Sequence, residues 1–167
     1  PSPLFAQKQP PRPEGVKLLA RVLADKGFLD DVFAFDGPGG RLAIVRTDAG
    51  AYAEIEVLDL NQAGASLTRF DVAAITPVPL QVQFVLDGSK LFIVGGSLGD
   101  PGKLTGSLVD LSGKVLRKWG PAHDVVLSVA GGEDMVTVFG RRPVKAGTSY
   151  EVSRFRLRAA AAVDELR

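Results

Sequence analysis

The chain has 167 residues, enough for one domain with a sizeable core, and its 46% hydrophobic and 23% charged residues are ordinary values for a globular protein. A net charge of +1 gives no general attraction to nucleic acids or acidic membranes, and the absence of cysteine excludes disulfides and thiolate metal sites. The small net charge leads us to expect no nucleic-acid partner. No apolar run approaches the ~18 residues of a membrane-spanning helix, so we also expect no direct membrane insertion.

Residues 1–15, "PSPLFAQKQPPRPEG", contain five of the eleven prolines. Consecutive prolines favour extended polyproline conformations, so this stretch is interpreted as a tether outside the core. It is either a tail without a role or a spacer from a membrane anchor or a preceding domain. The chain begins with proline and has no recognisable signal peptide, which fits a mature exported protein, a trimmed chain or a cytoplasmic chain without its first methionine. We lean toward an extracytoplasmic location, periplasmic or secreted, although the compartment stays unknown.

From Val16 onward, short runs of alternating apolar and polar residues are separated by clusters of Gly, Asp, Pro and Ser. Alternation with period two and turn residues at the ends are typical of β-strands. The pattern predicts an all-β chain with eleven strands, over residues 31–36, 41–47, 53–60, 66–72, 80–86, 90–96, 105–111, 114–120, 125–131, 135–140 and 148–157.

The order of strands and turns repeats along the chain. In "FVLDGSKLFIVGG" (84–96) an Asp-Gly turn joins two strands, and the same order occurs before and after it. Asp59-Leu60 and Asp110-Leu111 lie 51 residues apart, and Arg69-Phe70 and Lys118-Trp119 lie 49 apart. The chain is therefore interpreted as three repeats of roughly 45–50 residues, each of short antiparallel strands.

The stretches "VLDGSKLFIV" and "LVDLSGKVLRKW" resemble the YVTN-type and tryptophan-aspartate-type repeats of β-propellers, although the Gly-His and Trp-Asp dipeptides of the latter are absent. The resemblance implies four-stranded antiparallel blades over residues 16–158. Three blades are fewer than the roughly four to eight of a closed propeller, so it also implies an incomplete ring. A β-sandwich, which also has short strands, is the alternative fold.

Both ends of this segment allow two interpretations. "VKLLARV" (16–22) aligns with the outer strands and would complete the last blade of a ring, but Val16, Leu19 and Leu23 also have helical spacing before Gly27. The Ala-rich end, residues 159–167, is predicted to be a tail or short helix, or instead the outer strand of the third blade.

Catalytic motifs are weak in this sequence. "GGSLG" (95–99) fits the G-x-S-x-G nucleophile elbow around Ser97, but that motif needs a following helix and a histidine base. Asp100-Pro101-Gly102 follows instead, so we interpret the stretch as a loop between strands. The carboxylates of Asp25, Asp30, Asp31 and Asp36 are close in sequence, but Asp36 is interpreted as a turn former. We expect no catalytic residue, metal site or cofactor.

The resemblance also implies candidates near the central channel. In propellers, the loops that lead from an outer strand to the next inner strand line one face beside the channel. This position makes Lys26, His123 and Asp124 channel-face candidates. His123 is the only histidine and is either an ordinary loop residue or a ligand contact.

Basic residues concentrate near the end of the chain, in "GRRPVKAG" (140–147) and "SRFRLR" (153–158). On a strand, Arg154, Arg156 and Arg158 would share one face. That face is either solvated, with charge protecting a sheet edge, or a contact for an acidic partner or another anion. We predict a partner-binding surface formed by Arg141, Arg142, Lys145 and Arg154, with Trp119 and Tyr150 as aromatic anchors.

These expectations favour a non-catalytic β-propeller subunit or binding platform that mediates protein–protein interaction in a larger assembly. A protein partner, a second copy or a further part of the same protein would complete the ring. The alternative is part of a propeller enzyme, such as a lactonase-like hydrolase or a quinoprotein, whose other site residues lie on blades outside this chain.

Overall fold

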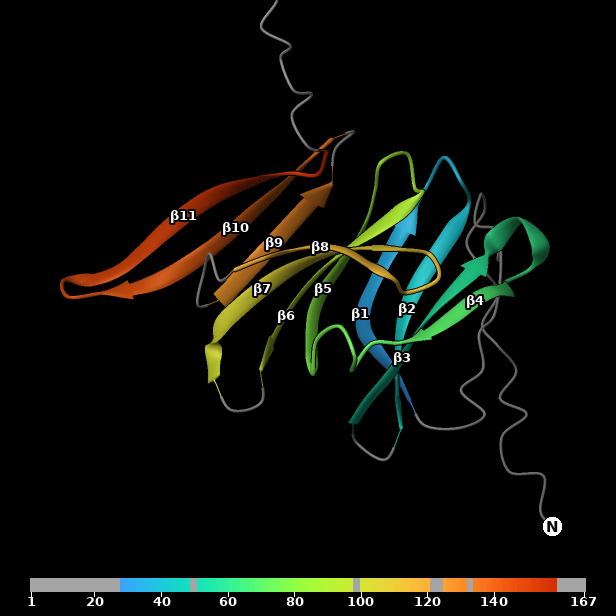
Figure 1. Cartoon of the computed structure of the whole chain (residues 1–167), viewed down its shortest axis with the longest axis horizontal. Helices are drawn as coiled ribbons and strands as arrows, with labels where there is room; N and C mark the ends of the chain where they lie inside the picture. The colour runs from blue at the N-terminus through green and yellow to red at the C-terminus, as the bar shows by residue number, and fades with distance from the viewer. Residues whose placement is uncertain (1–27, 49–50, 98–99, 121–124, 132–133, 159–167) are drawn as a thin grey trace, which may run out of the picture.

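The structure is a computed structural model that describes residues 28–48, 51–97, 100–120, 125–131 and 134–158. Within these ranges the chain is all-β, with three antiparallel sheets, one short 3-10 turn and no α-helix. Figure 1 shows the sheets following one another along the chain. Residues 1–27, with the predicted tether, the 16–22 strand and Lys26, lie outside the described residues, as do His123, Asp124 and residues 159–167.

All eleven predicted strands are present, and their order within each sheet follows the chain. The first sheet contains β1 (Phe28–Asp36), β2 (Arg41–Asp48), β3 (Ala51–Asp59) and β4 (Ala65–Asp71), with the 3-10 turn η1 (Leu60–Gln62) between the last two. The second sheet contains β5 (Val78–Val85), β6 (Lys90–Ser97), β7 (Asp100–Asp110) and β8 (Val115–Trp119). The third sheet contains β9 (Val125–Gly131), β10 (Met135–Val144) and β11 (Gly147–Arg156).

Strand β10 is longer than the sequence indicated. The stretch that begins at Arg141 was interpreted as a loop, but Arg141 pairs with Tyr150, and the pairing continues to Val144 and Gly147. Strand β9 pairs with β10 only as far as Arg141, so Pro143 lies where β10 has one partner strand instead of two. A proline, which has no N–H to donate, is tolerated at such a position. Arg141 and Arg142 are therefore strand residues, and their prediction as loop residues was wrong.

Two turns explain why an Asp-Leu pair recurs at the ends of β3 and β7. Asp59 ends β3 and accepts a hydrogen bond from the backbone N–H of Asn61 at 2.8 Å. Asp110 ends β7 and accepts from the N–H of Ser112 at 2.9 Å. Both are side-chain-to-backbone turns two residues long, a role in which aspartate is favoured. The tight Asp-Gly turn is also confirmed, because Asp87 and Gly88 have φ of 54° and 73° and Ser89 N–H donates to the Leu86 carbonyl at 3.0 Å.

Each sheet packs through a face against the next one. We call the face toward the preceding sheet the front face and the face toward the following sheet the back face. The back face of the first sheet and the front face of the second share one buried apolar cluster, which includes Ala43, Val45, Ile55, Val57 and Phe70 from the first sheet and Val82, Phe84, Leu91, Ile93 and Val109 from the second.

A second cluster joins the back face of the second sheet to the front face of the third. It contains Val85, Phe92, Val94, Leu104 and Leu108 from the second sheet and its turns, and Val136, Val138 and Leu157 from the third. The rings of Trp119 and Phe155 lie 5.7 and 5.6 Å from the ring of Phe92. The first strands of the sheets also meet, since β1 contacts β5 and β5 contacts β9. The described sheets do not close into a ring.

Candidate functional site

The structure brings together only some of the predicted partner-binding residues. Arg142 pairs with Ser149 and so occupies the alternate register position to Arg141. Arg141, Tyr150 and Arg154 lie on one face of the third sheet, and Lys145 is exposed in the turn between β10 and β11. Trp119 lies elsewhere. It is half-buried beside Phe92 and Phe155, between the second and third sheets, so its ring packs in the interior.

The back face of the third sheet is uncovered among the described residues and combines apolar and basic side chains. Phe139 and Tyr150 stack with their ring centroids 6.1 Å apart, and 62% of Tyr150 and 65% of Val152 are exposed. The strand pairing puts Arg154 and Arg156 on this same face, as the alternation predicted, whereas Arg158 lies beyond the end of β11. We call this surface the third back face; its residues are Met135, Thr137, Phe139, Arg141, Tyr150, Val152, Arg154 and Arg156.

No carboxylate of β10 or β11 lies on the third back face. Glu151, the one acidic residue of these two strands, pairs across from Gly140 and so belongs to the opposite face of the sheet. The three arginines therefore give this face a positive charge that no acid of either strand offsets. A surface with exposed aromatic rings and arginines has the composition of a protein-interaction site, because both kinds of residue are enriched where binding energy concentrates.

The front face of the first sheet forms the other end of the stack. Phe33 and Phe35 are 49% and 57% exposed, and their rings meet edge to face at 5.6 Å. Leu42, Ile44 and Leu58 lie on the same face, and the last two are buried. We call these five residues the first front face. The sequence analysis did not single them out, although the alternation in "DVFAFD" already separates the two phenylalanines from Val32 and Ala34.

A buried ion network lies on the same side of the first sheet. Glu56 is 1% exposed and accepts from Nε of Arg46 at 2.5 Å and from Nε of Arg69 at 2.8 Å. Burial by itself raises the pKa of Glu56, but hydrogen bonds from Ser66, Arg69 and Arg46 and the charge of Arg46 outweigh it and leave the pKa lowered. Because these groups hold one another across β2, β3 and β4, they fix strand register.

This ion network was not predicted from the sequence. Arg46, Glu54, Glu56 and Arg69 all alternate with apolar residues, in "IVRT", "AEIEVL" and "LTRF". On strands that pair in register, this alternation puts opposite charges on one face, and that signal was present in the sequence.

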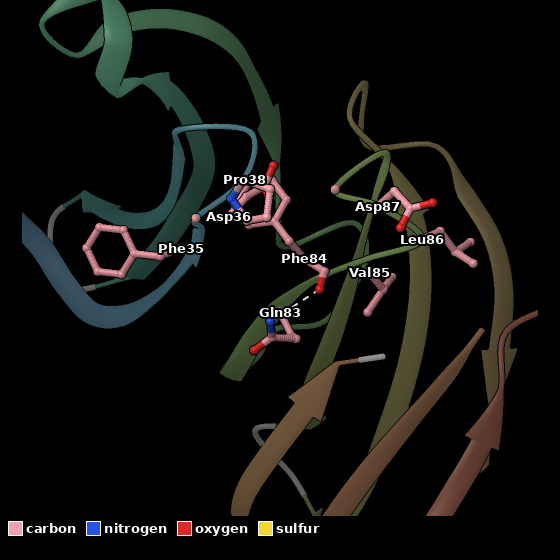
Figure 2. Close-up of a pocket in the computed structure, with 10 residues that line it drawn as sticks. Phe35, Asp36, Pro38, Gln83, Phe84, Val85, Leu86 and Asp87 are labelled. Atoms are coloured by element: carbon pink, nitrogen blue, oxygen red, sulfur yellow. Dashed lines mark hydrogen bonds between the residues drawn. The ribbon is translucent and has the colours of Figure 1, made fainter. Parts of the chain in front are cut away.

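A cavity of about 410 Å³ lies between the β1–β2 turn and the β5–β6 turn, lined by residues 35–38 and 83–88. Figure 2 shows the ring of Phe35 pointing away from the other labelled residues, whereas Pro38 and Phe84 both line the cavity. Gln83 donates from Nε2 to the Phe84 carbonyl at 3.2 Å.

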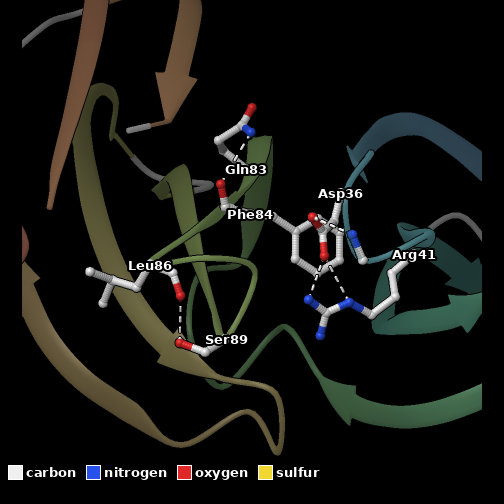
Figure 3. Close-up of polar contacts among 7 residues, drawn as sticks. Asp36, Arg41, Gln83, Phe84, Leu86 and Ser89 are labelled. Atoms are coloured by element: carbon white, nitrogen blue, oxygen red, sulfur yellow. Dashed lines mark hydrogen bonds and ion pairs between the residues drawn. The ribbon is translucent and has the colours of Figure 1, made fainter. Parts of the chain in front are cut away.

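Asp36, one of the two acidic residues that line this cavity, is bound to Arg41. Arg41 donates from Nε to Oδ2 of Asp36 at 2.9 Å, and its guanidinium lies over the Phe84 ring, 5.4 Å from the centroid (Figure 3). The N–H of Gly39 donates to Oδ1 of Asp36 at 3.2 Å, which confirms Asp36 as a turn former. Both carboxylate oxygens of Asp36 are thus occupied, and Arg41 ties the first sheet to the second.

Ser97 does not have the setting of a catalytic serine. It is the last residue of β6, and β7 begins three residues later, so a strand follows where the nucleophile elbow requires a helix. Among the described residues, no group of three or more His, Cys, Asp or Glu side chains could hold a metal ion. Those same parts of the chain also contain no helix long and apolar enough to cross a membrane.

No protein-family model matches the chain, and a search of curated protein sequences gives no significant match.

Proposed function

We propose that this chain is a segment of a β-propeller and serves as a non-catalytic binding platform in a larger assembly. The observation that carries the proposal is the pair of end faces that no described sheet covers, each with exposed aromatic side chains. Soluble monomers rarely leave contiguous apolar patches of this kind in water, whereas interaction sites do.

The propeller interpretation is supported by the arrangement of the sheets. Successive sheets pack face to face, their strands follow chain order, and the first strands β1, β5 and β9 are neighbours. A propeller blade also begins at its innermost strand and packs against the blades before and after it. Since roughly four to eight blades are needed to close a ring, three would leave two faces for another polypeptide to cover.

The non-catalytic interpretation is supported by the partners of the ionisable groups. Asp36 and Glu56, the buried carboxylates of the described residues, are both bound to arginines. A general base or nucleophile has to be available to a substrate, and these two carboxylates are engaged within the protein.

The test is the size of the native assembly. The full-length protein, tagged and expressed in its own cells, is sedimented in gentle lysates, and its size is compared with that of a variant carrying Arg141→Glu and Arg154→Glu. We expect the wild type in a particle larger than one chain and the variant in a smaller one, because charge reversal places repulsive groups on the third back face. Lys114→Glu, in the exposed turn before β8, is the matched control and leaves the particle unchanged.

Equal thermal unfolding of the three purified proteins shows that the fold is intact. A wild-type protein that sediments from its own cells as a single chain would contradict the proposal. Stoichiometric binding of a metal or organic cofactor to that single chain would favour an enzyme instead.

A further inference from the structure

We infer that the polypeptide that covers the end faces is a second copy of this chain, joined head to tail. In this dimer the first front face of each copy packs on the third back face of the other copy. The two contacts are equivalent, and the six sheets close around a two-fold axis. This inference rests on the proposed function, because it names the partner of that same platform.

The internal repeat shows what the first front face is built to contact. Asp36 pairs with Arg41 across a four-residue turn, and Val85 pairs with Lys90 across another. Superposing these turns shifts the numbering by 49, which makes Phe35 equivalent to Phe84. The same shift makes Leu42 equivalent to Leu91 and Ile44 equivalent to Ile93. All three positions have identical residues.

In the second sheet these residues already have a partner. Phe84, Leu91 and Ile93 belong to the front face of that sheet, where they are 6%, 0% and 0% exposed against the back face of the first sheet. Phe35, the equivalent of Phe84, is 57% exposed. Phe35 of the first sheet is therefore exposed, whereas the second sheet uses the equivalent Phe84 to pack on a back face. The third back face is an uncovered back face in the described part of the chain.

The arginine that accompanies this contact also has a counterpart. At the contact between the first two sheets, Arg41 begins β2 on the back face and places its guanidinium over Phe84. In the third sheet the corresponding first residue of β10 is Met135, and Arg156 lies directly opposite it in the register. Arg156 of one copy is thus positioned on the back face to meet Phe35 of the other, in the kind of cation–π contact that Arg41 makes with Phe84.

Charge disfavours the two symmetric alternatives. Two third back faces in contact would oppose six arginines with no carboxylate from β10 or β11 between them. Two first front faces in contact would bury the phenylalanines but leave both basic faces in water. A head-to-tail contact gives the arginines aromatic partners, and a contact between unlike faces closes into a ring when the rotation permits.

Sedimentation of two complementary variants tests the inference. A front variant carries Phe33→Ser and Phe35→Ser, and a back variant carries Arg154→Glu and Arg156→Glu. We expect the purified wild-type chain to form dimers. Each variant alone is expected to be a monomer, with a dissociation constant raised at least about tenfold.

An equimolar mixture decides the geometry, because the intact back face of the front variant can bind the intact front face of the back variant. We expect the mixture to form heterodimers with one contact, weaker than the wild-type dimer. If either variant dimerises alone, or if the mixture stays monomeric, the head-to-tail arrangement is wrong. Circular dichroism checks the fold, and Phe35→Ser alone replaces the front variant if the double substitution unfolds.

A wild-type chain that stays monomeric at high concentration overturns the second copy as partner. The size of the native assembly remains a separate measurement. If the native particle is large but the purified chain is a monomer, the proposed binding platform is retained. The partner that covers the end faces is then a different polypeptide.

Discussion

Gly88 is a position where one added methyl group should be costly in the contact between the first two sheets. Its φ is +73°, in the left-handed region that side chains with a Cβ rarely adopt. A Cβ built at Gly88 would also fall on Nη2 of Arg41 and Oδ2 of Asp36, well inside contact distance. The substitution Gly88→Ala therefore strains the turn and displaces the Arg41–Asp36 ion pair, whose guanidinium lies over Phe84 of the second sheet.

The expected loss has two parts. Holding alanine in the left-handed region costs roughly 1–2 kcal/mol. Displacing Arg41 leaves the carboxylate of Asp36, which is 8% exposed, without its main partner, and an unsatisfied buried polar group costs about 1–3 kcal/mol. The free energy of unfolding should fall by about 2–5 kcal/mol, measured from the urea midpoint at an unchanged slope.

Two comparisons separate these parts. Gly37→Ala, in the neighbouring turn, meets no atom within 4 Å and has no positive φ, so it should change stability by no more than about 0.5 kcal/mol. In a background that carries both Asp36→Ala and Arg41→Ala, Gly88→Ala should cost only the backbone part, roughly 1–2 kcal/mol, because both side chains that its Cβ would meet are gone. An equal cost in both backgrounds would refute the displacement of the ion pair, and a loss below about 0.5 kcal/mol would refute the strain as well.

Three further predictions concern the core and the ion network. Gly106→Ala should lower the free energy of unfolding by about 1–3 kcal/mol in urea titrations, because its Cβ would meet Cζ of Phe92 at 2.6 Å, whereas Gly120→Ala, with no atom within 4 Å, should be neutral. Phe92→Ala should cost about 3–5 kcal/mol by the same measurement, since Phe92 is 0% exposed at the centre of the second cluster. Glu56→Gln should cost about 3–5 kcal/mol at neutral pH, because Arg46 loses its buried carboxylate. The pKa of Glu56 is lowered on folding, so its stabilisation is present above the unfolded pKa of about 4.3 and is lost as the pH falls through the folded pKa. The unfolding midpoints of the wild type and of Glu56→Gln should therefore converge in acid. A constant gap between the two midpoints would contradict the network.

The strands could be predicted because their signal is local. In β11 the alternation "TSYEVSRFR" gives nearly every second residue to the core side, and in "VLDGSKL" the Asp-Gly pair marks the turn by its freedom to take positive φ. The extension of β10 through Arg141 was not predicted, because "RRPVKAG" has turn composition and its strand pairing depends on Tyr150 and Ser149 in the opposite strand. Tertiary pairing decided that boundary.

The candidate site was predicted less completely. The arginines and Tyr150 of the third back face were found because charge and aromatic residues stand out in a sequence. Phe33 and Phe35 were missed, since an apolar residue on a strand is usually part of a core and only the stacking of the sheets shows which face is left uncovered. Trp119 was predicted on the binding surface but packs between two sheets. A large aromatic residue is a candidate binding anchor, and the sequence alone does not show whether it is buried or exposed.

The three sheets differ in a way that follows from their neighbours. In β6 the run "LFIV" is buried at every position, as expected for a strand covered on both faces. Strand β2 has the similar run "LAIV", with Leu42 and Ile44 on the front side, where no described sheet covers them. Strand β11 alternates instead, with Val152 and Arg154 on its uncovered side. By its own pattern the first sheet is composed for burial on both faces, whereas the back face of the third sheet combines apolar residues with arginines. Two ends of such different chemistry favour contact with each other over contact with their own kind.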